Sequence, residues 1–188
     1  MWRKITDYFK NLEKNITKDF TPFQINLWNL FLFLTTFAVL ALVLHFLVWV
    51  NWNPISVQIF HASVVSKILN LLGLNTFHSG TFIHVSGFGL VEIVKDCLGW
   101  KSMVALLGLI IATRKISWKN KVLGFLWGVV IIFIGNIVRL TTTIYSVVKL
   151  NINFELVHSL IWQWGLTLLI ILIWFFWMRM SLSKSKKG

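Results

Sequence analysis

A long, almost uninterrupted apolar run near the N-terminus is the feature that most constrains the fold. From Leu30 onward, only Thr35, Thr36 and His45 interrupt a stretch of apolar side chains that ends at position 50. About 20 such residues cross the hydrocarbon core of a bilayer, because an α-helix rises about 1.5 Å per residue. The run therefore predicts a transmembrane helix over residues 27–50.

Three further apolar segments predict additional spans. Residues 122–148 and 158–178 are long enough to cross a bilayer on their own. The segment between the first of these and the long run has a purely apolar part, residues 103–112, that is too short to cross a bilayer. It becomes a span over 94–113 only if its helix begins near Val94. The sequence thus predicts an all-α integral membrane protein with about four transmembrane helices.

The composition agrees with this fold class. Hydrophobic residues make up 57% of the 188 residues and charged residues only 13%, whereas soluble chains are about a quarter charged. This composition excludes a disordered chain and argues against a soluble domain. The chain has one cysteine, Cys97, so it has no internal disulfide framework.

The basic residues predict the topology. Most of them lie in three places: the N-terminal segment 1–26, the loop between the second and third spans, and the tail 179–188. With four spans all three places fall on one side, which the positive-inside rule identifies as the cytoplasm. We therefore predict cytoplasmic N and C termini around a single transmembrane catalytic domain, residues 27–178. The net charge of +12 is then a topology signal and an attraction to anionic headgroups, not a sign of nucleic-acid binding.

The outer segment 51–93 carries one predicted helix and one possible hairpin. Residues 57–72 place apolar side chains on one helical face and polar side chains on another, which is typical of an amphipathic helix lying on a membrane surface. Residues 75–94 alternate in part between apolar and polar side chains, with Gly80, Gly87 and Gly89 as turn signals.

Counting about 20 residues outward from each cytoplasmic anchor places three reactive side chains at one depth. Cys97 falls about one turn inside the outer boundary of the second span, Arg139 falls just inside that of the third, and His158 opens the fourth. Each has a simpler interpretation: Cys97 as a small buried side chain, Arg139 as a snorkelling cation, and His158 as an interfacial residue. Their coincidence in depth favours a common site.

The chemistry that fits this trio is acyl transfer by a thiol. Cys97 would attack as the thiolate, His158 would act as general base and then acid, and Arg139 would stabilise the oxyanion. Lys101 lies one turn after Cys97 and either favours the thiolate or snorkels outward. Asn136 lies one turn before Arg139 and either orients Arg139, donates to the substrate, or makes an interhelical hydrogen bond.

Three short motifs carry a resemblance to the exosortase/archaeosortase family. The segment D-C-L-G-W-K-S (96–102) resembles the family's cysteine motif, G-N-I-V-R (135–139) resembles its N-x-x-R motif, and V-H-S (157–159) resembles its histidine motif. The motifs occur in the family's order, and the resemblance covers residues 57–178. The chain departs from the family pattern at Leu98, where serine is usual, and at Lys101, where arginine is usual. No glutamate follows the histidine, and many members have about eight spans.

The resemblance implies a membrane-embedded cysteine transpeptidase with Cys97 as nucleophile, His158 as acid/base and Arg139 as stabiliser. Its partners would be exported proteins that bear a C-terminal sorting tail: a short motif, a hydrophobic helix and a basic cluster. Cleavage would occur at the outer face of the cell membrane, and the acyl acceptor would be water, a lipid or a glycan. No cofactor is implied.

Two other functions compete with this one. A non-enzymatic membrane assembly or export accessory would tolerate independent substitution of Cys97, Arg139 and His158. A metal site would use His61, His78 and His84, which lie in the outer segment near acidic residues. The spacing of these histidines matches no standard ligand pattern, so we interpret them as solvated loop residues and expect no metal.

Overall fold

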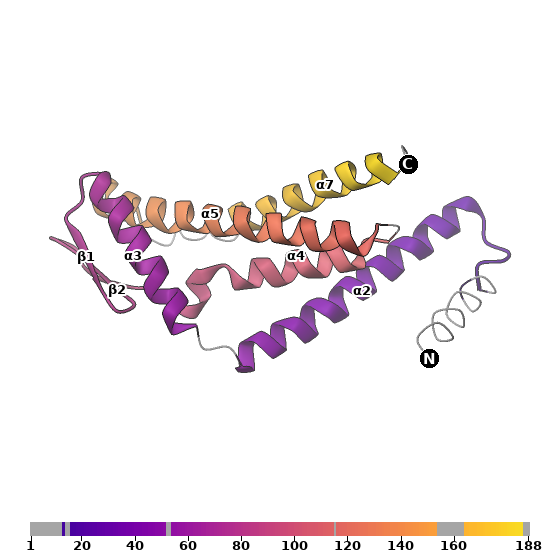
Figure 1. The fold of residues 1–188 in the computed structure, drawn as a ribbon, viewed down its shortest axis with the longest axis horizontal. Helices are drawn as coiled ribbons and strands as arrows, with labels where there is room; N and C mark the ends of the chain where they lie inside the picture. The colour runs from indigo at the N-terminus through magenta and orange to yellow at the C-terminus, as the bar shows by residue number, and fades with distance from the viewer. Residues whose placement is uncertain (1–12, 14–15, 52–53, 115, 154–163, 186–188) are drawn as a thin grey trace.

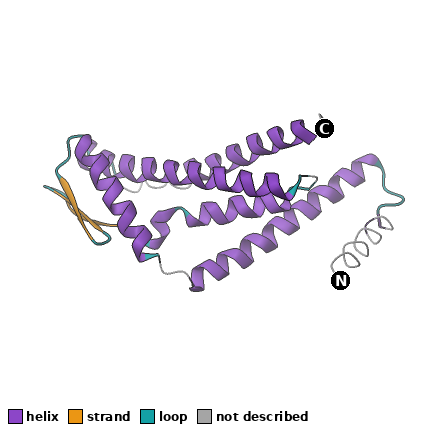
Figure 2. Cartoon of the chain, in the orientation of Figure 1, coloured by secondary structure: helices purple, strands orange, loops and turns teal. Residues whose placement is uncertain are grey.

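The computed structural model describes residues 13, 16–51, 54–114, 116–153 and 164–185. Helices dominate this part of the chain (Figure 2). Four of them follow the long axis of the molecule (Figure 1), and these are α2 (Pro22–Asn51), α4 (Trp100–Ala112), α5 (Trp118–Leu150) and α7 (Leu166–Ser185). Within the described residues, three helices (α2, α5 and α7) are long and apolar enough to cross a membrane. The predicted fold class, an all-α integral membrane protein, is confirmed.

The observed helices extend beyond the predicted spans. α2 begins at Pro22 instead of residue 27, α5 begins at Trp118 instead of residue 122, and α7 continues past residue 178 to Ser185. Hydropathy marks the bilayer core, whereas backbone hydrogen bonds carry a helix on into the headgroup region. The first residues of the predicted fourth span, 158–163, lie outside the described residues.

The second predicted span is divided into two pieces. α4 has 13 residues and therefore rises only about 20 Å, which is less than the roughly 30 Å of a hydrocarbon core. The short 3₁₀ helix η1 (Lys95–Leu98) precedes it, and Gly99 joins them with a φ of 73°. The continuous helix expected from Val94 is thus interrupted at Gly99.

Glycines on α5 allow α7 and α4 to approach its backbone closely. A Cβ at Gly124 would collide with the Trp177 indole, and a Cβ at Gly128 would collide with Leu106. The Trp177 indole Nε1 also donates to the Asn120 carbonyl at 3.0 Å. Small residues that bring backbones together are the usual packing device of membrane helices, and here they join α5 to its two neighbours.

α3 (Ile55–Leu71) and a small sheet lie at one end of the molecule, and the C-terminal end of α7 lies at the other (Figure 1). The sheet is antiparallel in the order β1 (Thr76–Ser79), β2 (Phe82–Val85) and β3 (Gly89–Glu92). A two-residue turn at Gly80, where φ is 58°, joins the first two strands. The possible hairpin is therefore present, and a third strand extends it.

The predicted amphipathic helix is present as α3, and one of its faces packs into the protein. Its apolar residues Phe60 and Leu71 are exposed, as a helix lying on a membrane surface requires. The opposite face is buried and mixes polar with apolar side chains: Gln58, His61, Ala62, Val65, Ser66 and Leu69. The Gln58 amide, for example, donates to the Ile93 carbonyl at 2.8 Å. This face packs against η1 and α5, and so brings α3 to the region of Cys97.

Candidate functional site

Cys97 lies in η1, in the link between β3 and α4. Gly99 adopts a left-handed conformation directly after this turn and lets the chain enter α4 in a new direction. On the other side of Cys97, the Lys95 ammonium donates to the Val48 and Trp49 carbonyls at 3.0 Å each. These carbonyls belong to the last turn of α2, so the cysteine turn is fastened to the end of that helix.

Asn136 and Arg139 converge on the Cys97 backbone from α5. The Asn136 amide donates to the Cys97 carbonyl at 2.7 Å, and Arg139 Nη2 donates to the same oxygen at 3.2 Å. The two side chains are 0% and 3% exposed. Because α4 begins only after Gly99, the Cys97 carbonyl lies in a break in the helix, where a buried carbonyl needs a donor from elsewhere. Asn136 and Arg139, which the sequence analysis singled out as site residues, supply these donors.

The Cys97 thiol is buried and carries no disulfide. The side chain is 8% exposed, and the charged groups that act on it are Arg139, Asp96 and Glu92. A guanidinium beside a cysteine stabilises the thiolate, which is the form that attacks a carbonyl carbon. Burial disfavours the charged thiolate, and Arg139 opposes that effect, so the guanidinium is the charged group through which this site can favour nucleophilic attack.

Lys101 points away from the thiol. Its ammonium forms an ion pair with Asp96 at 3.0 Å, and both side chains are 53% exposed. The same carboxylate accepts a hydrogen bond from the Trp100 indole at 3.3 Å. This exposed position agrees with the outward orientation considered for Lys101, and its other role, support of the thiolate, stays a prediction. An exposed pair of this kind contributes about 0–1 kcal/mol.

His158, the predicted acid/base, lies outside the described residues. Its proposed role stays a prediction. The part of the site that the structure describes therefore consists of Cys97, Asn136 and Arg139.

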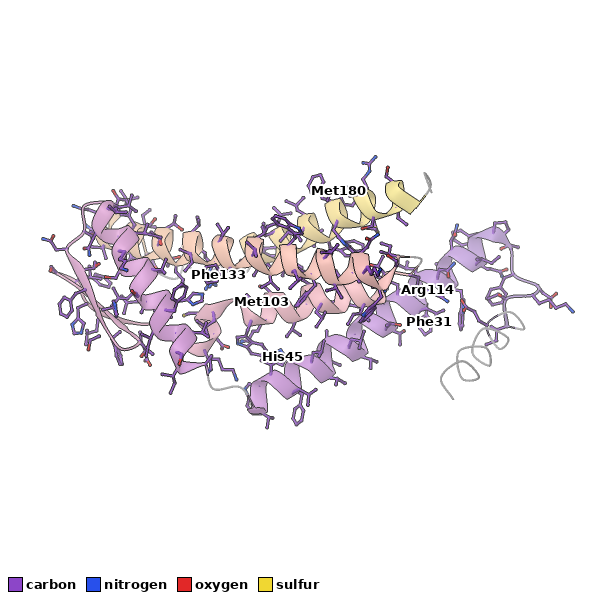
Figure 3. All side chains as sticks on the ribbon, viewed as in Figure 1. Phe31, His45, Met103, Arg114, Phe133 and Met180 are labelled. Atoms are coloured by element: carbon purple, nitrogen blue, oxygen red, sulfur yellow. The ribbon has the colours of Figure 1, made fainter. Side chains whose placement is uncertain are left out.

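One histidine near the site was misinterpreted from the sequence. His61 was expected to be a solvated loop residue, but it lies on α3 and is 1% exposed. Its Nδ1 lies 2.8 Å from the Val57 carbonyl oxygen, and its ring meets the Phe133 ring edge-on at 5.0 Å. Phe133, labelled in Figure 3, belongs to α5 one turn before Asn136. The missed signal was the helical spacing of Gln58, His61 and Ser66 on the face opposite the apolar residues.

The other two histidines of the segment 51–93 lie in the sheet. The His84 ring stacks on Phe77 at 4.3 Å, and His78 is exposed on β1. Within the described ranges, no three histidine, cysteine, aspartate or glutamate side chains gather in a way that could hold a metal ion.

The comparison with protein families gives one match. The profile of the family described as transmembrane exosortase (Exosortase_EpsH) matches residues 25–178. The match begins at residue 25, near the start of α2, so it includes the first predicted span and all three motifs. Neither a curated protein nor a solved structure matches the chain significantly.

Proposed function

Because the chain belongs to the transmembrane exosortase family, we propose that it is a membrane-embedded cysteine transpeptidase. Its substrates are exported proteins that carry a C-terminal tail made of a short motif, a hydrophobic helix and a basic cluster. The observation that carries this proposal is the joint hold of Asn136 and Arg139 on the Cys97 turn. Such a hold fixes the position of a nucleophile beside a cation before substrate arrives.

The proposed reaction begins with attack of the Cys97 thiolate on the carbonyl carbon of the scissile peptide bond. The carbonyl oxygen becomes an oxyanion, which the Arg139 charge stabilises. The C–N bond then breaks, His158 gives a proton to the departing amine of the tail, and a thioester remains on Cys97. An acceptor nucleophile then gives its proton to His158, attacks this thioester and takes the acyl group, which releases the Cys97 thiolate.

The site is proposed to face the outside of the cell membrane. The basic segments before α2, between α4 and α5 and at the end of α7 support a cytoplasmic location for that end of the molecule. Cys97 lies near α3 and the sheet, at the opposite end of the spans. An exported protein whose tail helix packs beside the spans would present its motif at this level.

The proposal is tested by processing of a tail-bearing reporter in cells. The reporter is a secreted domain fused to the C-terminal tail of a host protein with an apolar helix and a basic cluster. Cys97→Ala should abolish cleavage, and Arg139→Ala should slow it about a hundredfold, as loss of an oxyanion donor does. Thr142→Ala, an exposed position on the same helix as Arg139, should cleave at the wild-type rate. Cleavage by Cys97→Ala at the wild-type rate would reject the nucleophile.

A further inference from the structure

His61 is a buried titratable residue that the proposed reaction does not use. It lies on the inner face of α3, next to Ala62 and Val65, and these two residues share a hydrophobic cluster with Cys97. Phe133 of α5 packs against both this cluster and the His61 ring. The imidazole is therefore enclosed in the same region as the cysteine turn.

The hydrogen bond of His61 defines its tautomer. Nδ1 lies 2.8 Å from the Val57 carbonyl oxygen, and a carbonyl only accepts, so Nδ1 carries the hydrogen. Burial lowers the pKa of His61, donation to Val57 raises it, and the charge of Arg139 lowers it further. The ring is thus neutral at neutral pH, and Nε2 carries a lone pair.

Two buried acceptors in this region lack donors among the described residues. One is His61 Nε2 and the other is Asn136 Oδ1, whose amide nitrogen already donates to the Cys97 carbonyl. Burying an acceptor without a donor is unfavourable, and each such atom in a native protein requires an explanation. The two atoms have the same chemical character, because each offers a lone pair and neither offers a hydrogen.

The character of these atoms defines what can bind them. A carboxylate or phosphate brings only acceptor oxygens, so it could not donate a hydrogen bond to either atom. A peptide backbone brings N–H donors, and it is the polymer whose carbonyl carbon Cys97 would attack. The acceptors are therefore suited to a peptide that lies beside the thiol.

We propose that His61 Nε2 and Asn136 Oδ1 bind backbone N–H groups of the exported protein at the Cys97 site. This inference rests on the proposed function and adds α3 to the elements that hold the substrate. His61 is then a substrate-binding residue, distinct from the acid/base role assigned to His158.

The test measures apparent KM and kcat for cleavage of the purified tail-bearing reporter by the full-length protein. His61→Leu removes the Nε2 acceptor and should raise KM about tenfold, the effect of one lost hydrogen bond, while kcat changes less than threefold. His61→Gln, whose amide oxygen can reach the Nε2 position, should keep KM within threefold of the wild-type value. His78→Leu, an exposed histidine replaced in the same way, should leave both constants unchanged.

The thermal midpoint of the free protein separates binding from a structural role. His61→Leu should melt at or above the wild-type temperature, because it removes an unpaired buried acceptor. A lower midpoint for both His61→Leu and His61→Gln, with equal losses of activity, would make His61 a structural residue and overturn the inference. If His61→Leu fails to accumulate, His61→Asn replaces it. Its amide nitrogen can still donate to Val57, and its amide oxygen is too short to reach the Nε2 position, so the same rise in KM is expected.

Parallel assay of Cys97→Ala separates the two proposals. If this variant cleaves the reporter at the wild-type rate, the proposed function and the inference both fail. If it is inactive while His61→Leu has the wild-type KM, only the inference fails.

Discussion

At the scale of single residues, the Cys97 carbonyl determines the geometry of the site. The turn at Gly99 interrupts the second span and leaves this oxygen inside the protein, where Asn136 and Arg139 donate to it. Gly99 also touches Asn136, since a Cβ there would lie 3.3 Å from Asn136 Cγ. The break in the helix and the two donors therefore depend on each other, and we expect a change in either to displace Cys97.

Gly99→Ala should weaken both the fold and the activity. Its φ of 73° is a left-handed conformation, which disfavours alanine by about 1–2 kcal/mol, and the added methyl group would also press on Asn136. We expect a lower thermal midpoint in detergent and slower cleavage of the tail-bearing reporter.

Gly80→Ala provides the matched control for this change. Gly80 has a φ of 58°, but a Cβ there would meet nothing within 4 Å. Gly80→Ala should therefore lower the thermal midpoint and leave the rate of cleavage unchanged. Equal effects of the two substitutions on cleavage would show that the contact between Gly99 and Asn136 has no role in the site.

At the scale of elements, α5 organises the molecule. Toward one end its glycines receive Trp177 of α7 and Leu106 of α4, and toward the other end it supplies Asn136 and Arg139 to the site. The position of α5 against α4 therefore determines whether these donors reach Cys97. Close packing at the glycines is the physical basis of that position.

Gly124→Ala tests this packing. The added Cβ would collide with the Trp177 indole and break its hydrogen bond to Asn120. We therefore expect the free energy of unfolding to fall by about 1–3 kcal/mol, as overpacking usually causes. The measurement is the thermal midpoint of the purified protein in detergent. Gly165→Ala, where a Cβ would meet no described atom within 4 Å, is the control and should match the wild type. A wild-type midpoint for Gly124→Ala would disprove the packing role.

The elements also show what the sequence could predict. Hydropathy was sufficient for α2 and α5 because a membrane span needs a long apolar run. Counting residues outward from the cytoplasmic anchors predicted that Cys97 and Arg139 lie at one depth, and the structure places Arg139 on the Cys97 carbonyl. The division of the second span was not predicted, because it depends on donors from α5 that are distant in sequence. The burial of His61 was missed for a related reason: the face of α3 that carries His61 is covered by other elements that are distant in sequence.

At the scale of the whole molecule, the two ends differ in character. The start of α2, the link between α4 and α5 and the end of α7 lie at one end, and α3 with the sheet lies at the other (Figures 1 and 2). Arg114, labelled in Figure 3, lies at the first end and forms an ion pair with Glu13 at 2.8 Å. A bilayer perpendicular to the spans would separate these ends, as the basic residues predict.

Single cysteines in a Cys97→Ser background test this orientation. His78→Cys, in the sheet, should react with a membrane-impermeant maleimide on intact cells, because the proposed topology places β1 outside the cell. Lys119→Cys, at the start of α5, should react only after the cells are permeabilised. The reverse pattern would invert the topology and place the site in the cytoplasm.

Detection of a thioester on Cys97 tests the central claim most directly. Purified protein is mixed with the tail-bearing reporter, quenched in acid and examined by mass spectrometry. We predict an adduct with the mass of the cleaved reporter, located on Cys97, removed by hydroxylamine and absent from Cys97→Ala. Cleavage of the reporter by Cys97→Ala at the wild-type rate, with no adduct on the wild-type cysteine, would contradict catalysis by this thiol.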